Sequence, residues 1–188
     1  MKKHQGMTLI ESIVAMVLIA VAMVTLTSLL FPNVKNSAAP HYQTRAIALG
    51  QGFMSQILAR GFDHNSNFDG GSTRCGEDGV LCIAADGLGA EEAQVVDYND
   101  VDDYIGCWYT TNTQSQCPTG SVQKSLADVF GSTINTEYPN FRVDVRVFYD
   151  GNMDGSDDGA VSTLKRIEMA IHAGQYGPYP LVAYKGNY

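Results

Sequence analysis

The chain has 188 residues, enough for one globular domain of ordinary size with an extension and too few to require two full domains. It carries 12 Lys and Arg against 20 Asp and Glu, which gives a formal net charge of -8 at pH 7. Between Asp63 and Asp103 the only Lys or Arg is Arg74, so no basic stripe is available to neutralise phosphates, and we expect no binding to nucleic acid.

Residues 13–31 form an apolar stretch, IVAMVLIAVAMVTLTSLLF, without a charged side chain. As an α-helix this stretch measures roughly 28 Å, close to the hydrocarbon thickness of a bilayer. Lys2 and Lys3 precede it, and the positive-inside rule therefore places the N-terminus in the cytoplasm and everything after Pro32 outside. We expect a single-pass membrane segment followed by an external domain.

Two ordinary explanations fit this segment less well. A secretory signal peptide needs a small-residue cleavage site, and the best candidate, Ser37-Ala38-Ala39, is followed directly by Pro40. A plain signal anchor leaves Glu11 unexplained, because a carboxylate in an apolar segment costs on the order of a few kcal/mol and usually has a partner. A Glu11 side chain that merely reaches the edge of the bilayer stays open as an alternative.

The N-terminal sequence KKHQGMTLIESIVAMVLIAVAM resembles the leader and first helix of type IV prepilins. The resemblance implies that prepilin peptidase cuts after Gly6 and that the new terminus, Met7, is N-methylated, although the family more often has Phe at this position. It also implies that Glu11, about one helical turn further on, meets the Met7 amine of a neighbouring subunit. Such a pair would set the register between helices more than it would add net stability.

Pro32 and Pro40 bracket a polar stretch, where we expect the helix to kink or loosen before it restarts at Pro40. Beyond it, apolar residues recur near helical spacing and predict an amphipathic helix that packs on a domain. These residues are Ile47, Phe53, Met54, Ile57 and Leu58. Gly50 and Gly52 weaken this helix, and Gly61 is a suitable end.

Residues 62–104 are rich in Gly, Asp, Asn and Ser, which predicts loops with short strand-like pieces at most, at 80–83 and 93–96. The acidic run 97–106 is expected to be a solvated turn without chemistry.

The sequence contains no CxxC pair of the kind that indicates zinc binding or redox chemistry, so the four cysteines favour disulfides in an oxidising compartment. They are Cys75, Cys82, Cys107 and Cys117. Pairing of nearest neighbours is one of three possible connectivities.

The C-terminal part alternates apolar and polar residues at the period of half-buried strands, in FRVDVRVFYD and again in LKRIEMAIHA. The turn-rich sequence between them predicts an antiparallel pair with a long loop, and LVAYKGNY is a candidate for a further strand. The chain is therefore predicted to be an α+β protein in which a long N-terminal helix, half transmembrane and half amphipathic, packs on an antiparallel sheet. This is the architecture that the resemblance to type IV pilins implies.

The predicted organisation has four parts. Residues 1–6 are a cleaved leader, 7–31 a transmembrane and polymerisation helix, 32–61 its kinked amphipathic continuation, and 62–188 a periplasmic or extracellular pilin domain.

The loop DGNMDGSDD matches the first half of an EF-hand calcium loop. Its candidate ligands are Asp150, Asn152, Asp154, Ser156 and Asp158. Position twelve of the pattern is Val161, which cannot supply a carboxylate, and both flanks are predicted strands rather than helices. Calcium is therefore a possible ligand here, but no cofactor is required, and an acidic hairpin loop is the alternative.

No catalytic motif such as HExxH, GxSxG or a P-loop occurs in the sequence, and we expect a structural protein rather than an enzyme. Further blocks, including YPNFRVDVRVFYD and the terminal YKGNY, are similar to minor pilins of the mannose-sensitive haemagglutinin (MSHA) type. The resemblance implies a subunit of the bacterial inner membrane that later lies in a surface pilus used for attachment. Its implied partners are other pilins, prepilin peptidase, the inner-membrane assembly machinery and membrane lipid. A pseudopilin of type II secretion, or an anchored periplasmic domain that never polymerises and binds calcium or another ligand, remains an alternative.

Overall fold

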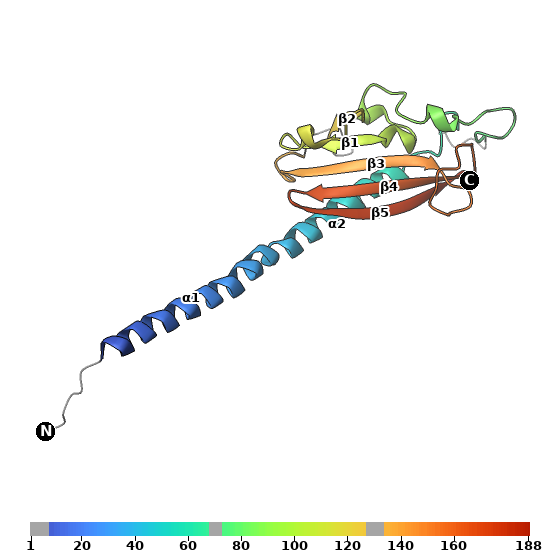
Figure 1. Ribbon diagram of the computed structural model, residues 1–188. Helices are drawn as coiled ribbons and strands as arrows, with labels where there is room; N and C mark the ends of the chain where they lie inside the picture. The colour runs from blue at the N-terminus through green and yellow to red at the C-terminus, as the bar shows by residue number, and fades with distance from the viewer. Residues whose placement is uncertain (1–7, 68–72, 127–133) are drawn as a thin grey trace. The chain divides into compact units, whose positions relative to one another are not determined.

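The computed structural model describes residues 8–67, 73–126 and 134–188. The chain forms two compact units, Met1–His41 and Tyr42–Tyr188. Helix α1 (Leu9–Ser37) belongs to the first unit, whereas most of helix α2 (Ala39–Leu58) and all five strands belong to the second (Figure 1). The predicted α+β class is confirmed.

Helix α1 continues past Pro32 and is interrupted only at Ala38, so the predicted loosening lies near Pro40 rather than across the whole polar stretch. Helix α2 begins at Ala39, which places Pro40 in its first turn, as predicted. Proline is tolerated there because the N–H that it lacks would have no partner inside the helix.

The span Leu9–Leu30 has a mean hydropathy of 2.7 over its most apolar window, and among the described residues it is the one helical span long and apolar enough to cross a membrane. Two of its hydroxyl side chains are satisfied within the helix. The Thr25 hydroxyl donates to the Ala22 carbonyl at 2.9 Å, and the Thr27 hydroxyl donates to the Met23 carbonyl at 2.7 Å. The span therefore presents an almost wholly apolar surface.

The second unit is built on a five-stranded sheet in the order β2-β1-β3-β4-β5. The strands are β1 (Gly106–Tyr109), β2 (Gln123–Ser125), β3 (Phe141–Tyr149), β4 (Leu164–Ala173) and β5 (Tyr176–Gly186). Strands β3, β4 and β5 are antiparallel neighbours, as predicted, and β1 pairs antiparallel with β3. The outer strand β2 runs parallel to β1, so the sheet is mixed rather than wholly antiparallel.

Helix α2 packs across one face of the sheet (Figure 1). Phe53 and Ile57 are buried as predicted, but Ile47 is 36 % exposed and the neighbouring Ala46 takes its place in the core. Gly50 allows close packing rather than only weakening the helix, because a Cβ at this position would lie 2.6 Å from Cδ1 of Leu181 and 2.8 Å from Cδ1 of Ile171.

The described part of the 62–104 region consists of loops and short 3₁₀ turns, as predicted, but neither proposed strand-like piece forms a strand: residues 80–83 lie in loop, and Val95–Asp97 is a 3₁₀ turn. The structure joins Cys75 to Cys82 and Cys107 to Cys117, which is the nearest-neighbour pairing.

The prediction of a solvated acidic turn at 97–106 is wrong. Three of its acids are fully buried: Asp100, Asp102 and Asp103. Their neighbours in the sequence, Tyr98, Val101 and Tyr104, pack in the hydrophobic core. The acids between these residues are therefore buried with them.

Candidate functional site

The N-terminus of α1 carries a reciprocal pair of side-chain contacts. The Glu11 N–H donates to the Thr8 hydroxyl at 3.4 Å, and the Thr8 N–H donates to Oε2 of Glu11 at 3.5 Å. This is the geometry of a capping box, with both hydrogen bonds near the long limit. The spacing T-x-x-E indicates such a box, whereas the resemblance to prepilins assigns Glu11 only to contacts between subunits. Gly6 and Met7 lie outside the described residues.

The lateral surface of α1 is apolar and exposed within the described chain. The large apolar side chains from Leu9 to Leu30 are all more than half exposed. An isolated apolar surface of this size is unstable in water and needs lipid or other apolar helices to cover it. The helix is therefore suited to membrane insertion and to packing against further helices.

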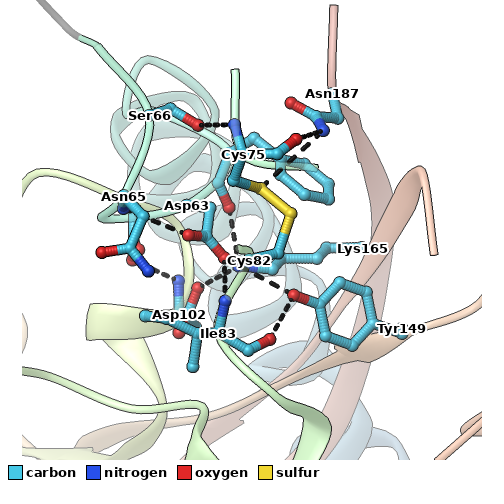
Figure 2. Close-up of polar contacts among 12 residues, drawn as sticks. Asp63, Asn65, Ser66, Cys75, Cys82, Ile83, Asp102, Tyr149, Lys165 and Asn187 are labelled. Atoms are coloured by element: carbon cyan, nitrogen blue, oxygen red, sulfur yellow. Dashed lines mark hydrogen bonds and ion pairs between the residues drawn. A yellow bond between two sulfur atoms is a disulfide. The ribbon is translucent and has the colours of Figure 1, made fainter. Parts of the chain in front are cut away.

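The second unit contains a buried ionic centre around Lys165 (Figure 2). The Lys165 ammonium donates to Oδ1 of Asp102 at 2.6 Å and to Oδ2 of Asp63 at 3.2 Å. Its third partner is the Phe62 carbonyl, at 2.7 Å. All three donors of the ammonium are satisfied, which leaves it no capacity to bind or activate a further group.

Surrounding contacts fix this centre to the loops. Oδ2 of Asp63 also accepts the Ile83 N–H at 3.0 Å, and the Tyr149 hydroxyl donates to the Ile83 carbonyl at 2.7 Å. Burial and the nearby Asp63 carboxylate raise the pKa of Tyr149, which keeps its hydroxyl a donor. The Cys75–Cys82 disulfide lies beside Asp63 (Figure 2). The centre links the loop residues Phe62, Asp63, Ile83 and Asp102 to Tyr149 of β3 and Lys165 of β4.

A group of acidic side chains, separate from the ionic centre around Lys165, lies in the loop from Glu91 to Asp103. Burial, with the charges of Asp102 and Asp103 adding to it, raises the pKa of Asp100 to about 9, although the nearby Lys165 opposes the shift. Partial burial of its carboxyl group likewise raises the pKa of Glu91 to about 7, although the residue as a whole is exposed. Without a bound cation the fold therefore favours the protonated, uncharged forms of these two carboxyl groups. Sequence analysis predicted the acidic composition of this segment but not the cluster.

The predicted calcium loop at 150–158 is held by hydrogen bonds within the protein. Asp150 is fully buried, and its carboxylate accepts the backbone N–H groups of Asp154 and Gly155, each at 3.0 Å. The Tyr184 hydroxyl donates to Oδ2 of the same carboxylate at 2.8 Å, and the Arg166 guanidinium lies 3.7 Å from it.

The other candidate ligands of this loop also have protein partners. The Asp154 carboxylate accepts the Asn152 amide at 2.9 Å and the Ser156 N–H at 2.8 Å, and Asp158 accepts the Gly151 N–H at 2.7 Å. The backbone contacts hold the pKa of Asp154 below its usual range. Calcium binding at this loop stays a prediction.

Comparison with known proteins bears on the first of these sites. Residues 1–27 match the family model of the prokaryotic N-terminal methylation motif. No curated protein and no solved structure matches the chain. The motif indicates a type IV pilin-like or pseudopilin-like protein, processed by prepilin peptidase and assembled with other pilins. It also fits membrane anchoring by α1 and a structural rather than an enzymatic role.

Proposed function

We propose that this chain is a minor pilin of an MSHA-type type IV pilus that supports pilus biogenesis and surface attachment. It is inserted in the bacterial inner membrane with its N-terminus in the cytoplasm, cleaved after Gly6, methylated at Met7 and then packed into the filament through α1. One observation carries the proposal: within the methylation motif, an exposed apolar helix begins with a single carboxylate, that of Glu11.

The finer assignment rests on blocks of sequence resemblance to the MshD minor pilin, which extend over most of the chain. The α+β domain with its three long antiparallel strands is consistent with a pilin-like fold and supports the coarser part of the proposal, a pilin-like subunit. A pseudopilin of type II secretion shares the methylation motif and remains the second candidate.

The intrachain cap and the proposed contact between subunits make different demands on Glu11. A cap needs only an acceptor at this position, and glutamine serves in capping boxes as glutamate does. Neutralising the Met7 amine of a neighbouring subunit in lipid requires a negative charge. Substitutions at Thr8 and Glu11 therefore separate the two roles.

We expect Glu11→Ala and Glu11→Gln to reach the membrane at wild-type levels and to be lost from filaments sheared from cells by at least about ten-fold, a difference of about 1.4 kcal/mol. Thr8→Ala, which removes the cap and keeps the charge, serves as the matched control and should be incorporated within about two-fold of wild type. Immunoblots of sheared filaments and of membrane fractions measure both quantities. Normal incorporation of Glu11→Gln would refute the charge pair and favour a membrane-anchored domain that does not polymerise.

Processing is tested separately by the intact mass of the protein recovered from its host. The proposal requires loss of residues 1–6 and a gain of one methyl group. A protein that still begins at Met1, or one that begins beyond Phe31, would contradict it.

A further inference from the structure

The loop that follows Glu91 brings carboxylates together at the spacing of a metal site. One carboxylate oxygen from each of Glu91, Asp100 and Asp103 lies within 4.8 Å of the other two. Oxygens on opposite sides of a calcium ion lie about 4.6 to 5.2 Å apart, because each Ca–O distance is about 2.3 to 2.6 Å. Three oxygens no more than 4.8 Å apart are therefore close enough to contact one calcium ion.

In each of the two buried carboxylates of this cluster, one oxygen accepts hydrogen bonds and the other oxygen accepts none among the described residues. Oδ1 of Asp100 accepts the N–H groups of Asp102 and Asp103 at 3.1 and 3.3 Å. Oδ2 of Asp103 accepts those of Asn99 and Asp100 at 2.8 and 3.1 Å. Both residues are 0 % exposed, yet among the described residues Oδ2 of Asp100 and Oδ1 of Asp103 have no hydrogen-bond partner. A buried carboxylate oxygen without a partner is costly, and a cation removes that cost.

Two more buried oxygens of the same loop are in the same condition. Within the described chain, Oε2 of Glu92 and Oδ1 of Asn99 also have no hydrogen-bond partner. With these two side chains as further oxygen ligands, the candidate ligands number five. Calcium takes six to eight oxygen ligands, some of them from water.

The positively charged side chains near the cluster form their contacts with other groups. Lys165 is held by Asp63 and Asp102. Lys124 donates to the backbone carbonyl of Asp103 at 2.6 Å and lies over the Tyr98 ring, 4.3 Å from its centroid. His64 contacts Glu92 at 3.2 Å. In the described chain no ion pair neutralises Glu91, Asp100 or Asp103.

The backbone that carries these oxygens is fixed by aromatic packing. The Tyr104 and Trp108 rings stack with centroids 5.7 Å apart, and the Trp108 indole N–H donates to the Tyr104 carbonyl at 2.8 Å. Tyr98 packs edge-on against Tyr104, with centroids 5.2 Å apart. The Asp100 and Asp103 carboxylates are therefore held in place before an ion arrives, which favours specific binding.

We propose that Glu91, Asp100 and Asp103 form a calcium site, with Glu92 and Asn99 as further oxygen donors. Oxygen ligands alone select a hard cation. The donors come from two places along an irregular loop, and calcium accepts such flexible geometry whereas magnesium demands a near-ideal octahedron at about 2.1 Å. A bound ion ties Glu91 to the Asp100–Asp103 turn, and therefore closes the loop between them onto the core.

The test is a calorimetric titration of the full-length chain in detergent with calcium chloride, in buffer that contains millimolar magnesium so that only a calcium-selective site responds. Wild type should bind about one ion per chain with a dissociation constant at or below the order of 10⁻³ M, the upper end for extracellular calcium modules.

Glu91→Gln should weaken binding at least about ten-fold, because it removes one charged ligand. Glu91 is exposed, so this variant should keep the fold. Asp103→Asn keeps an acceptor for the two amides but should abolish binding.

Asp154→Asn in the 150–158 loop is the matched control and should bind the ion of the Glu91 cluster as wild type does. A second ion per chain that is lost only in Asp154→Asn would add a site at that loop and leave this proposal standing. Absence of calcium binding in wild type would overturn it. So would unchanged binding in Glu91→Gln and Asp103→Asn, or a single ion that Asp154→Asn alone removes.

Discussion

Lys165 shows how one residue can depart from the pattern of its strand and still satisfy the physics of burial. It lies on the same face of β4 as Ile167, Met169 and Ile171, which point into the core. A lysine on this face is tolerated because Asp63 and Asp102 supply two carboxylates and the Phe62 carbonyl supplies the third acceptor. Removing only the lysine would leave two buried carboxylates without their cation.

We therefore expect Lys165→Met to lower the free energy of unfolding of the domain by on the order of 3 to 5 kcal/mol. Urea unfolding of the full-length chain in detergent, followed by fluorescence, measures this change. Trp108 is the single tryptophan and is fully buried in the core, so its emission reports on the domain alone.

Arg146→Met is the control for this substitution. The Arg146 side chain is 72 % exposed and pairs with Glu168 at 3.4 Å, and an exposed pair of this kind contributes about 1 kcal/mol or less. Equal effects of the two substitutions would show that the buried centre contributes no more than a surface ion pair.

The buried ionic centre also marks the limit of what the sequence predicts at the scale of residues. Lys165 and Asp102 are 63 positions apart, and each lies in a segment whose local pattern is ordinary. Local composition predicts a solvated turn around Asp102, because the partner that makes its burial favourable is invisible in that segment. The single local hint is that a charged residue, Lys165, occurs at the apolar phase of the alternation in β4.

Among the elements, length decided what could be predicted. Strands β3 and β4 have 9 and 10 residues, enough for the alternation of buried and exposed side chains to be recognised. Strands β1 and β2 have 4 and 3 residues, and neither shows a period on its own. They exist because β1 pairs with the edge of β3, which is a tertiary cause.

Helix α2 offers a matched pair of glycines that tests its packing on the sheet. A methyl group at Gly50 would meet Ile171 and Leu181, whereas no described atom lies within 4 Å of the position that a Cβ would take at Gly52. Gly52→Ala should stabilise the domain by about 0.5 to 1 kcal/mol through helix propensity. Gly50→Ala gains the same propensity but should lose about 1 to 3 kcal/mol to overpacking.

Urea midpoints of the two variants, again followed by Trp108 fluorescence, measure the difference. We expect Gly50→Ala to be less stable than Gly52→Ala by at least about 1 kcal/mol. Equal stabilities would mean that the Ile171 and Leu181 side chains move aside without cost, and that the close approach of α2 to the sheet is not constrained at Gly50.

At the scale of the whole molecule, folding and assembly use different parts of the chain. In the described structure the hydrophobic core of the domain takes all its members from Tyr42 onward, whereas the large apolar side chains of α1 from Leu9 to Leu30 are exposed. The methylation motif lies wholly within the first unit. A subunit built in this way can complete its domain before its helix leaves the lipid for other helices.

This separation predicts that the domain does not need α1 in order to fold. A chain that begins at Ala39 and is exported to the periplasm should remain in solution without detergent. Its free energy of unfolding should match that of the full-length chain within about 0.5 kcal/mol, because the described hydrophobic core of the domain takes all its members from Tyr42 onward. A chain that begins at Gly50 is the control, since it lacks the buried side chains of Ala46 and Leu49 and the stacking of Tyr42 on Tyr176 at 4.9 Å. It should lose at least about 2 kcal/mol. If the chain that begins at Ala39 were destabilised as much as this control, α1 would belong to the folding unit of the domain, and assembly could not be independent of folding.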